Sequence, residues 1–288
     1  MADAAFWNVF ELKTNVFSYL NDDAFISDLA HCARVHSTWT DPALDILYRG
    51  DPIPPITTQH LKLALGRITR MTSTIAKAPF ARRQAYASRI ALLDLSMFNH
   101  WPLYCRMFHD FRFSRLKSLV VNSEGDLGEY LTEEKGKKDS GWSWLPSTLE
   151  YLIVCEWARY KRPSLLTGSF LRDIANNCPG LKRVWFRAAS FGFEPADLAC
   201  FFRRIRPREV RLDLGSQMNR VLTCDVLSAL SHGGHLETLI IGRNESDGLS
   251  GGYWRANELA QFYEQNTAAK PFASLRYLDV SLSCEAVL

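Results

Sequence analysis

Apolar and polar positions are arranged in two different ways along this chain, and the arrangement changes near residue 50. Before that point, apolar residues recur three or four positions apart, the spacing that gathers them on one face of an α-helix. From residue 89 onward, a six-residue pattern with apolar first, fourth and sixth positions recurs, as expected for short strands. The sequence therefore predicts a small helical unit followed by a repeating unit of strands and helices.

Residues 1–50 are predicted to form three short helices. The apolar face of the first helix consists of Val9, Leu12, Val16, Phe17 and Leu20. The second helix is expected to begin at Ser27 or Asp28 and to end near His36. The third is expected to begin at Pro42, because proline has no N–H group and loses no hydrogen bond in a first helical turn. Three short helices cannot bury all their apolar faces among themselves, so this unit is expected to dock against another surface.

The strand pattern occurs seven times in the rest of the chain. Its copies begin at Ile90, Leu116, Leu149, Leu181, Glu209, Leu236 and Leu275, at intervals of 26 to 39 residues. Segments with helical periodicity lie between copies, and the pairs Pro179-Gly180 and Gly233-Gly234 end two of these segments. One strand and one returning helix per copy is typical of an α/β solenoid, so we expect parallel strands with returning helices.

Alternate residues of a strand point to opposite faces of a sheet, so the positions between the apolar ones face away from the core. In the middle copies these positions carry the residue types that anchor protein interfaces. The candidate substrate-binding residues are Tyr151, Arg183, Trp185, Arg187 and Arg211. An acidic or phosphorylated peptide is the ligand that this set favours, with Trp185 as an exposed apolar anchor outside the core. The alternative is that the arginines pair with Glu150, Glu209 and Asp213 and bind nothing.

Composition and charge narrow the class of protein. The chain has 288 residues, of which 47% are hydrophobic and 23% charged, ordinary values for a globular protein. The net charge of +3 indicates neither a nucleic-acid nor a membrane partner. Residues 1–50 have a net charge of −4, opposite in sign to that of the whole chain. This difference supports a separate helical unit. We expect three parts: the helical module (1–50), a proline-containing connector with helices (51–88) and the repeat domain (89–288).

The sequence contains no signature of catalysis or of a cofactor site. None of the common nucleophile, zinc or phosphate-loop motifs occurs, so we expect no enzymatic activity, no metal and no cofactor. The seven cysteines include no CxxC pair, which favours free thiols in a reducing compartment. No secretory signal and no apolar run of about 20 residues is found, so a cytoplasmic or nuclear location is expected.

Residues 9–49 resemble an F-box. The matching positions are Glu11-Leu12, Val16-Phe17-Ser18-Tyr19-Leu20, Cys32-Ala33-Arg34-Val35, Trp39, Asp41-Pro42-Ala43-Leu44 and Leu47-Tyr48-Arg49. The proline that F-boxes commonly carry near their start is replaced here by Phe10. The segment Phe80–Leu95 is similar to the one that leads many F-box proteins into leucine-rich repeats. The resemblance therefore implies a short helical F-box-like module followed by a degenerate leucine-rich-repeat solenoid.

The resemblance also implies a function. It implies binding to a Skp-type adaptor, and hence to a cullin scaffold, through Val9, Phe10, Leu12, Val16, Leu20, Val35 and Trp39. The repeats would hold a protein substrate for ubiquitination, which makes the chain a substrate-recognition adaptor of an SCF-type ubiquitin ligase. Two alternatives stay open: a leucine-rich-repeat scaffold with no ubiquitin role, and an enzyme with a cofactor between repeats.

Overall fold

The computed structural model of the chain describes the following residues: 10–19, 26–49, 78–95, 110–122, 142, 144–155, 166–188, 191–214, 218–232, 234–242, 256–265 and 271–280. The chain divides into two compact units. The first unit consists of Met1–Asp94 with Phe111–Ser118, and the second of Leu95–Asp110 with Leu119–Leu288. The helix predicted between residues 57 and 79 lies almost wholly outside the described residues.

The first unit begins with three helices: α2 (Phe10–Tyr19), α3 (Ile26–Val35) and α4 (Ser37–Arg49). Their shared core is made of Phe17, Leu29, Ala43 and Ile46, with Cys32, Ala33 and Trp39 packed against it. The expected start of the third helix at Pro42 is wrong, because His36 caps the helix earlier. The His36 Nδ1 atom accepts a hydrogen bond from the Thr38 N–H at 3.1 Å. Pro42 consequently lies inside α4, and Trp39 in its first turn.

Helix α6 (Phe80–Ala87) follows in the same unit, and contacts with α4 hold it and the residues after it in place. The rings of Tyr48 and Tyr86 stack with their centroids 4.9 Å apart. Burial raises the pKa of Tyr48 to about 12, so the phenol stays neutral at physiological pH. The guanidinium of Arg89 binds the carboxylates of both Asp41 and Asp45. These contacts join α4 to the turn that leads into the first strand.

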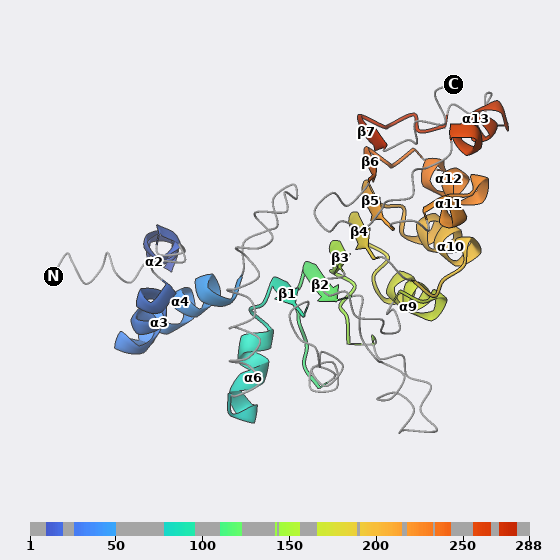
Figure 1. The fold of residues 1–288 in the computed structure, drawn as a ribbon. Coiled ribbons are helices and arrows are strands. Elements are labelled where there is room, and N and C mark those ends of the chain that lie inside the picture. Colours follow the sequence, from blue (N-terminus) through green and yellow to red (C-terminus); the bar gives the residue numbers. More distant parts are fainter. Residues whose placement is uncertain are drawn as a thin grey trace, which may run out of the picture. The chain divides into compact units, whose positions relative to one another are not determined.

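The repeat pattern builds one sheet of seven strands, in the order β1 to β7. The strands are β1 (Leu92–Asp94), β2 (Ser118–Asn122), β3 (Tyr151–Cys155), β4 (Arg183–Arg187), β5 (Glu209–Asp213), β6 (Thr238–Ile241) and β7 (Tyr277–Val280). The helices of the second unit are α9 (Gly168–Asn177), α10 (Pro195–Ile205), α11 (Met218–Val221), α12 (Cys224–Ser231) and α13 (Ala256–Gln265). These helices lie along one side of β3 to β7 (Figure 1). The expected α/β class with parallel strands and returning helices is confirmed.

The turn into most strands repeats one hydrogen-bond arrangement. Two successive N–H groups donate to a single carbonyl at the equivalent position of the preceding repeat. The pairs and their acceptors are Lys117 and Ser118 to Ala91, Lys182 and Arg183 to Glu150, Arg208 and Glu209 to Lys182, Glu237 and Thr238 to Arg208, and Arg276 and Tyr277 to Glu237. This ladder of backbone bonds defines which residues of successive repeats are equivalent.

The ladder corrects the start of one repeat. Strand β4 pairs with β5 in a register that places Val210 beside Val184, so Pro207 occupies the place of Leu181. The predicted start at Glu209 is therefore wrong by two residues. Both frames place apolar residues at the fourth and sixth positions, and pairing with the neighbouring strand shows that the frame from Pro207 holds.

A hydrophobic core lies between the sheet and the helices. Its buried members include Leu152, Val184, Phe186, Leu212 and Leu239 from strands, and Phe170, Ile174, Phe201, Phe202 and Leu227 from helices. The rings of Phe186 on β4 and Phe201 on α10 lie 5.8 Å apart. The positions predicted to face the core are thus confirmed in the middle repeats.

The helices begin at specific polar caps. The Thr167 side-chain oxygen accepts a hydrogen bond from the Phe170 N–H at 3.2 Å where α9 begins. Where α10 begins, the side chains of Glu194 and Asp197 each bond to the other's backbone N–H. A Cβ atom at Gly168 would lie 2.5 Å from the Asp197 carboxylate, so a larger residue there would displace this capping side chain. Within the described ranges, no helix combines the length and the apolar character needed to cross a bilayer.

Candidate binding surface on strands β3 to β5

Parallel pairing brings the predicted substrate-binding residues together on three adjacent strands. Tyr151, Arg183 and Glu209 form one row across β3, β4 and β5. Ile153, Trp185 and Arg211 form the next row, and Cys155, Arg187 and Asp213 the third. All these positions point to the face opposite the helices, since they alternate with core residues. The five predicted residues therefore do share one surface.

Trp185 is not the exposed anchor that the sequence suggested, because its side chain is buried with 2% of its surface exposed. Its indole N–H donates a hydrogen bond to Asp213 Oδ2 at 2.8 Å. The guanidinium carbon of Arg211 lies 4.5 Å from the centroid of the indole ring, within the range of a cation–π contact. The expected exposure of Trp185 is therefore wrong: side chains of the adjacent strand cover the ring.

Two of the predicted arginines bind carboxylates of the sheet itself. Arg183 Nε lies 2.8 Å from Glu209 Oε2, and the Arg183 guanidinium lies over the Tyr151 ring at 5.0 Å. Arg211 Nε lies 2.9 Å from Asp213 Oδ2. The alternative of pairing within the sheet face is thus confirmed for both arginines. An incoming anion would have to compete with these carboxylates.

Asp213 organises the surface, and sequence reasoning gave it only the role of a pairing partner. The carboxylate is buried, and its Oδ2 accepts hydrogen bonds from both Trp185 and Arg211. Its Oδ1 has no hydrogen-bond partner among the residues that the structure describes. A Cβ atom at Gly242 would lie 3.2 Å from this oxygen, so a glycine leaves the space that it needs. Burial raises the pKa of Asp213, while the charges of Arg211 and Arg187 act in the opposite direction.

The raised pKa of Asp213 predicts how stability depends on pH. The folded chain holds this proton at pH values where the unfolded chain, with an aspartate pKa of about 3.9, has already released it. The group therefore lowers the free energy of unfolding as pH rises from about 4 through its folded pKa. The variant Asp213→Asn lacks this proton equilibrium, so its stability relative to the wild type should rise with pH across that window. Urea denaturation at several pH values measures the difference.

The matched control is Asp225→Asn, which changes an exposed carboxylate on α12. Any change with pH in its stability relative to the wild type should be smaller than the change for Asp213→Asn. A constant or falling difference for Asp213→Asn would contradict the assignment of a raised pKa.

The exposed part of this surface is small and polar. The side chains of Arg183 and Arg211 are 34% and 27% exposed, and Tyr151 is half-buried. Arg187 is 7% exposed and is therefore nearly as buried as Trp185. The surface can thus offer guanidinium N–H groups and one phenol to a ligand. Among the described residues, no group of three or more histidine, cysteine or acidic side chains is placed to hold a metal ion.

The predicted adaptor-binding residues divide into three sets. Val16 and Val35 are exposed, at 37% and 68%, whereas Trp39 is half-buried with its ring edge-to-face against Phe17 at 5.9 Å. Phe10 and Leu12 belong to α2, but their side chains lie outside the description. Val9 and Leu20 lie outside the described residues altogether.

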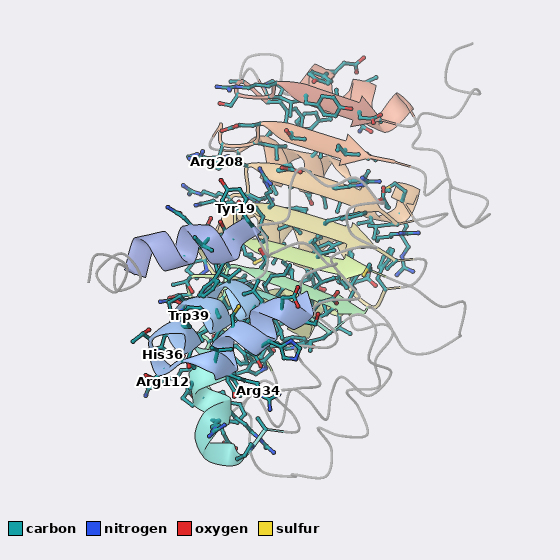
Figure 2. All side chains as sticks on the ribbon, turned by 90° about the vertical axis from the view of Figure 1, so that its left-hand side faces the viewer. Tyr19, Arg34, His36, Trp39, Arg112 and Arg208 are labelled. Carbon is teal, nitrogen blue, oxygen red and sulfur yellow. The ribbon has the colours of Figure 1, made fainter. Side chains whose placement is uncertain are left out.

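Sequence reasoning left one exposed aromatic of this unit out of the adaptor-binding set. Tyr19 at the end of α2 is 84% exposed, and Figure 2 shows it together with Trp39 on the helices. The signal for Tyr19 was present, because it lies within the apolar stretch that includes Val16.

No protein-family model and no curated protein matches this chain.

Proposed function

We propose that the chain is a substrate-recognition adaptor of an SCF-type cullin–RING ubiquitin ligase. In this proposal the helical module binds a Skp-type adaptor, and the repeats bind a protein substrate. The observation that carries the proposal is the helical module itself. The F-box-like residues Phe17 and Trp39 pack against one another in its core, while Val16, Tyr19 and Val35 remain exposed.

Exposed apolar side chains on so small a unit support a docking role. Contiguous apolar surface is costly in water, and it marks interaction sites when a protein retains it. Val16 and Tyr19 lie three positions apart on α2 and therefore on the same face of that helix. A partner that covers this face would complete the burial that three short helices cannot provide.

The chain would act by proximity rather than by bond chemistry. A scaffold that holds a target lysine close to a charged conjugating enzyme raises the local concentration of the two reactants. Substrate contact on the β3–β5 surface is proposed for Tyr151, Arg183 and Arg211, the predicted residues with accessible side chains. We propose the cytoplasm or nucleus as the location. The described cysteines are free thiols, and burial raises the pKa of Cys178 to about 12, which keeps this thiol unreactive.

Val16→Asp is expected to abolish adaptor binding. The substitution places a charge in the apolar face that would be buried against the partner, without touching the Phe17–Trp39 pair. Combining it with Leu12→Asp should give the same loss. Co-precipitation of a Skp-type adaptor and a cullin with the full chain measures the effect.

The control Ala196→Asp adds the same charge at an exposed position of α10 and should leave co-precipitation unchanged. Failure of the wild-type chain to bind the adaptor would refute the ubiquitin role and favour an interaction scaffold. Equal binding by Val16→Asp would refute the assignment of the α2 face.

A further inference from the structure

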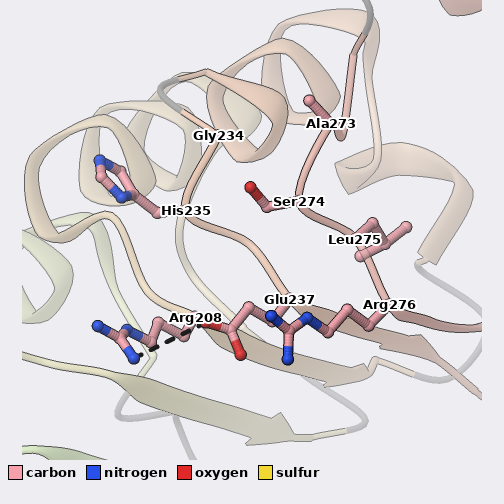
Figure 3. Close-up of a pocket in the computed structure, with 8 residues that line it drawn as sticks. All are labelled: Arg208, Gly234, His235, Glu237, Ala273, Ser274, Leu275 and Arg276. Carbon is pink, nitrogen blue, oxygen red and sulfur yellow. Dashed lines mark ion pairs between the residues drawn. The ribbon is translucent and has the colours of Figure 1, made fainter.

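A pocket of about 420 Å³ opens where the turns of the last three repeats enter strands β5 to β7. It is lined by Arg208, Gly234, His235, Glu237, Ala273, Ser274, Leu275 and Arg276. In Figure 3, Arg208, Glu237 and Arg276 line one side of the pocket, and His235 and Ser274 the other. The sequence analysis gave none of these residues a binding role.

The backbone ladder fixes the row of three charges. The N–H of Glu237 donates to the carbonyl of Arg208, and the N–H of Arg276 donates to the carbonyl of Glu237. Neighbouring strands lie about 4.8 Å apart, so the backbone positions of the two arginines are about 10 Å apart with Glu237 between them. The pocket of about 420 Å³ beside this row has room for a carboxylate group.

The positive charges of this row outnumber the negative charge. Glu237 lies 3.7 Å from Arg208 in a long, loosely held ion pair, and its side chain is 39% exposed. Arg276 is exposed, and no ion pair joins it to another residue of the described part of the chain. The row thus holds two guanidinium groups and one carboxylate, and this carboxylate pairs with Arg208. His235 and Ser274 line the other side of the pocket.

We infer that this pocket binds a carboxylate of an acidic segment of a partner protein, held chiefly by Arg276. The Arg208–Glu237 ion pair shows that a carboxylate can bind an arginine of this row. An incoming carboxylate would pair with Arg276 in the same way. The inference rests on the proposed function only in taking the repeats to be the protein-binding part of the chain. It places the acidic ligand at this pocket and not on the β3–β5 surface, where Arg183 and Arg211 are paired with carboxylates.

The full chain is tested by fluorescence anisotropy with a labelled hexaglutamate peptide and a labelled hexaglutamine peptide. Hexaglutamate should bind and hexaglutamine should not. Arg276→Gln should weaken hexaglutamate binding by about tenfold or more, the usual cost of losing a charge-assisted hydrogen bond. Glu237→Gln should strengthen binding, because it removes the competing carboxylate. The matched control Arg172→Gln, at an exposed arginine of α9, should leave binding unchanged.

Damage to the fold cannot produce the stronger hexaglutamate binding expected of Glu237→Gln. A gain in affinity would therefore indicate a binding site and not a structural effect of the substitution. Absence of hexaglutamate binding to the wild type would overturn the inference. So would an equal loss in Arg276→Gln and Arg172→Gln, which would indicate diffuse surface charge. A phosphoserine peptide of equal length is the third probe, and binding of this probe alone would overturn the assignment to a carboxylate.

Co-precipitation of the adaptor is measured on the same variants. Arg276→Gln and Glu237→Gln should bind the Skp-type adaptor as the wild type does. A wild-type chain that binds the adaptor but does not bind hexaglutamate therefore counts against the pocket alone. Peptide binding by a chain that does not bind the adaptor counts against the ubiquitin role alone.

Discussion

Trp185→Ala is expected to lower the free energy of unfolding of the second unit by about 3–5 kcal/mol, the usual cost of truncating a buried aromatic side chain. The indole ring is 2% exposed, and its N–H donates to the buried carboxylate of Asp213. The truncation therefore leaves a cavity, removes a hydrogen bond to a buried charge and takes away the ring that Arg211 covers. Chemical denaturation, followed by far-ultraviolet circular dichroism, measures the loss.

Two further variants separate the contributions at this position. Trp185→Phe keeps most of the ring and loses the N–H donor, so it should cost about 1–3 kcal/mol. Tyr277→Ala truncates an aromatic side chain that is 52% exposed on β7, and it should change stability by less than about 0.5 kcal/mol. If Trp185→Ala were as mild as Tyr277→Ala, the burial of the indole would be contradicted.

Phe17→Ala is expected to unfold the helical module while the second unit keeps its structure. Phe17 is 2% exposed and is the aromatic at the centre of the small core formed by α2, α3 and α4. Its truncation should cost about 3–5 kcal/mol, and a unit this small has little stability beyond that amount. Amide hydrogen exchange should show lost protection in α3 and α4 and retained protection in β4 and β5.

Tyr19→Ala is the control for this experiment, because it truncates an aromatic of the same helix that is 84% exposed. Protection of α3 and α4 should be unaffected by it. Loss of protection in β4 and β5 together with the helices of the module would show that the two units unfold as one.

Much of the fold could be predicted from periodicity alone. The helical spacing of apolar residues predicted α9, α10, α12 and α13, and the recurring six-residue pattern predicted all seven strands. These features depend on the alternation of side chains within one element, which the sequence records directly. The start of α4 could not be found in this way, because its cap is the ring nitrogen of His36, a residue seldom used as a cap.

The candidate surface was harder to predict because it depends on neighbours in space. Alternation correctly placed Trp185 on the face opposite Phe186, but it carries no information on what covers that face. The cover comes from Arg211 and Asp213 on the next strand. The pairing register between β4 and β5 decides which residue of β5 lies beside Trp185. This register could not be read from the pattern, because Pro207 stands where most repeats begin with leucine. The place of Arg208 beside Glu237 was missed for the same reason, whereas Glu237 and Arg276 already hold the same position in their copies of the pattern.

The ladder of backbone bonds at the strand entries also has an evolutionary consequence. These bonds join main-chain N–H groups to main-chain carbonyls, so no side-chain substitution removes them, except proline at a donor position. Pro207 precedes the first donor of its repeat and is therefore tolerated in a place that other repeats give to leucine. During evolution, even the first residue of the six-residue pattern can therefore be substituted while the strands stay aligned. The recognisable signature of the repeats should consequently fade faster than their architecture.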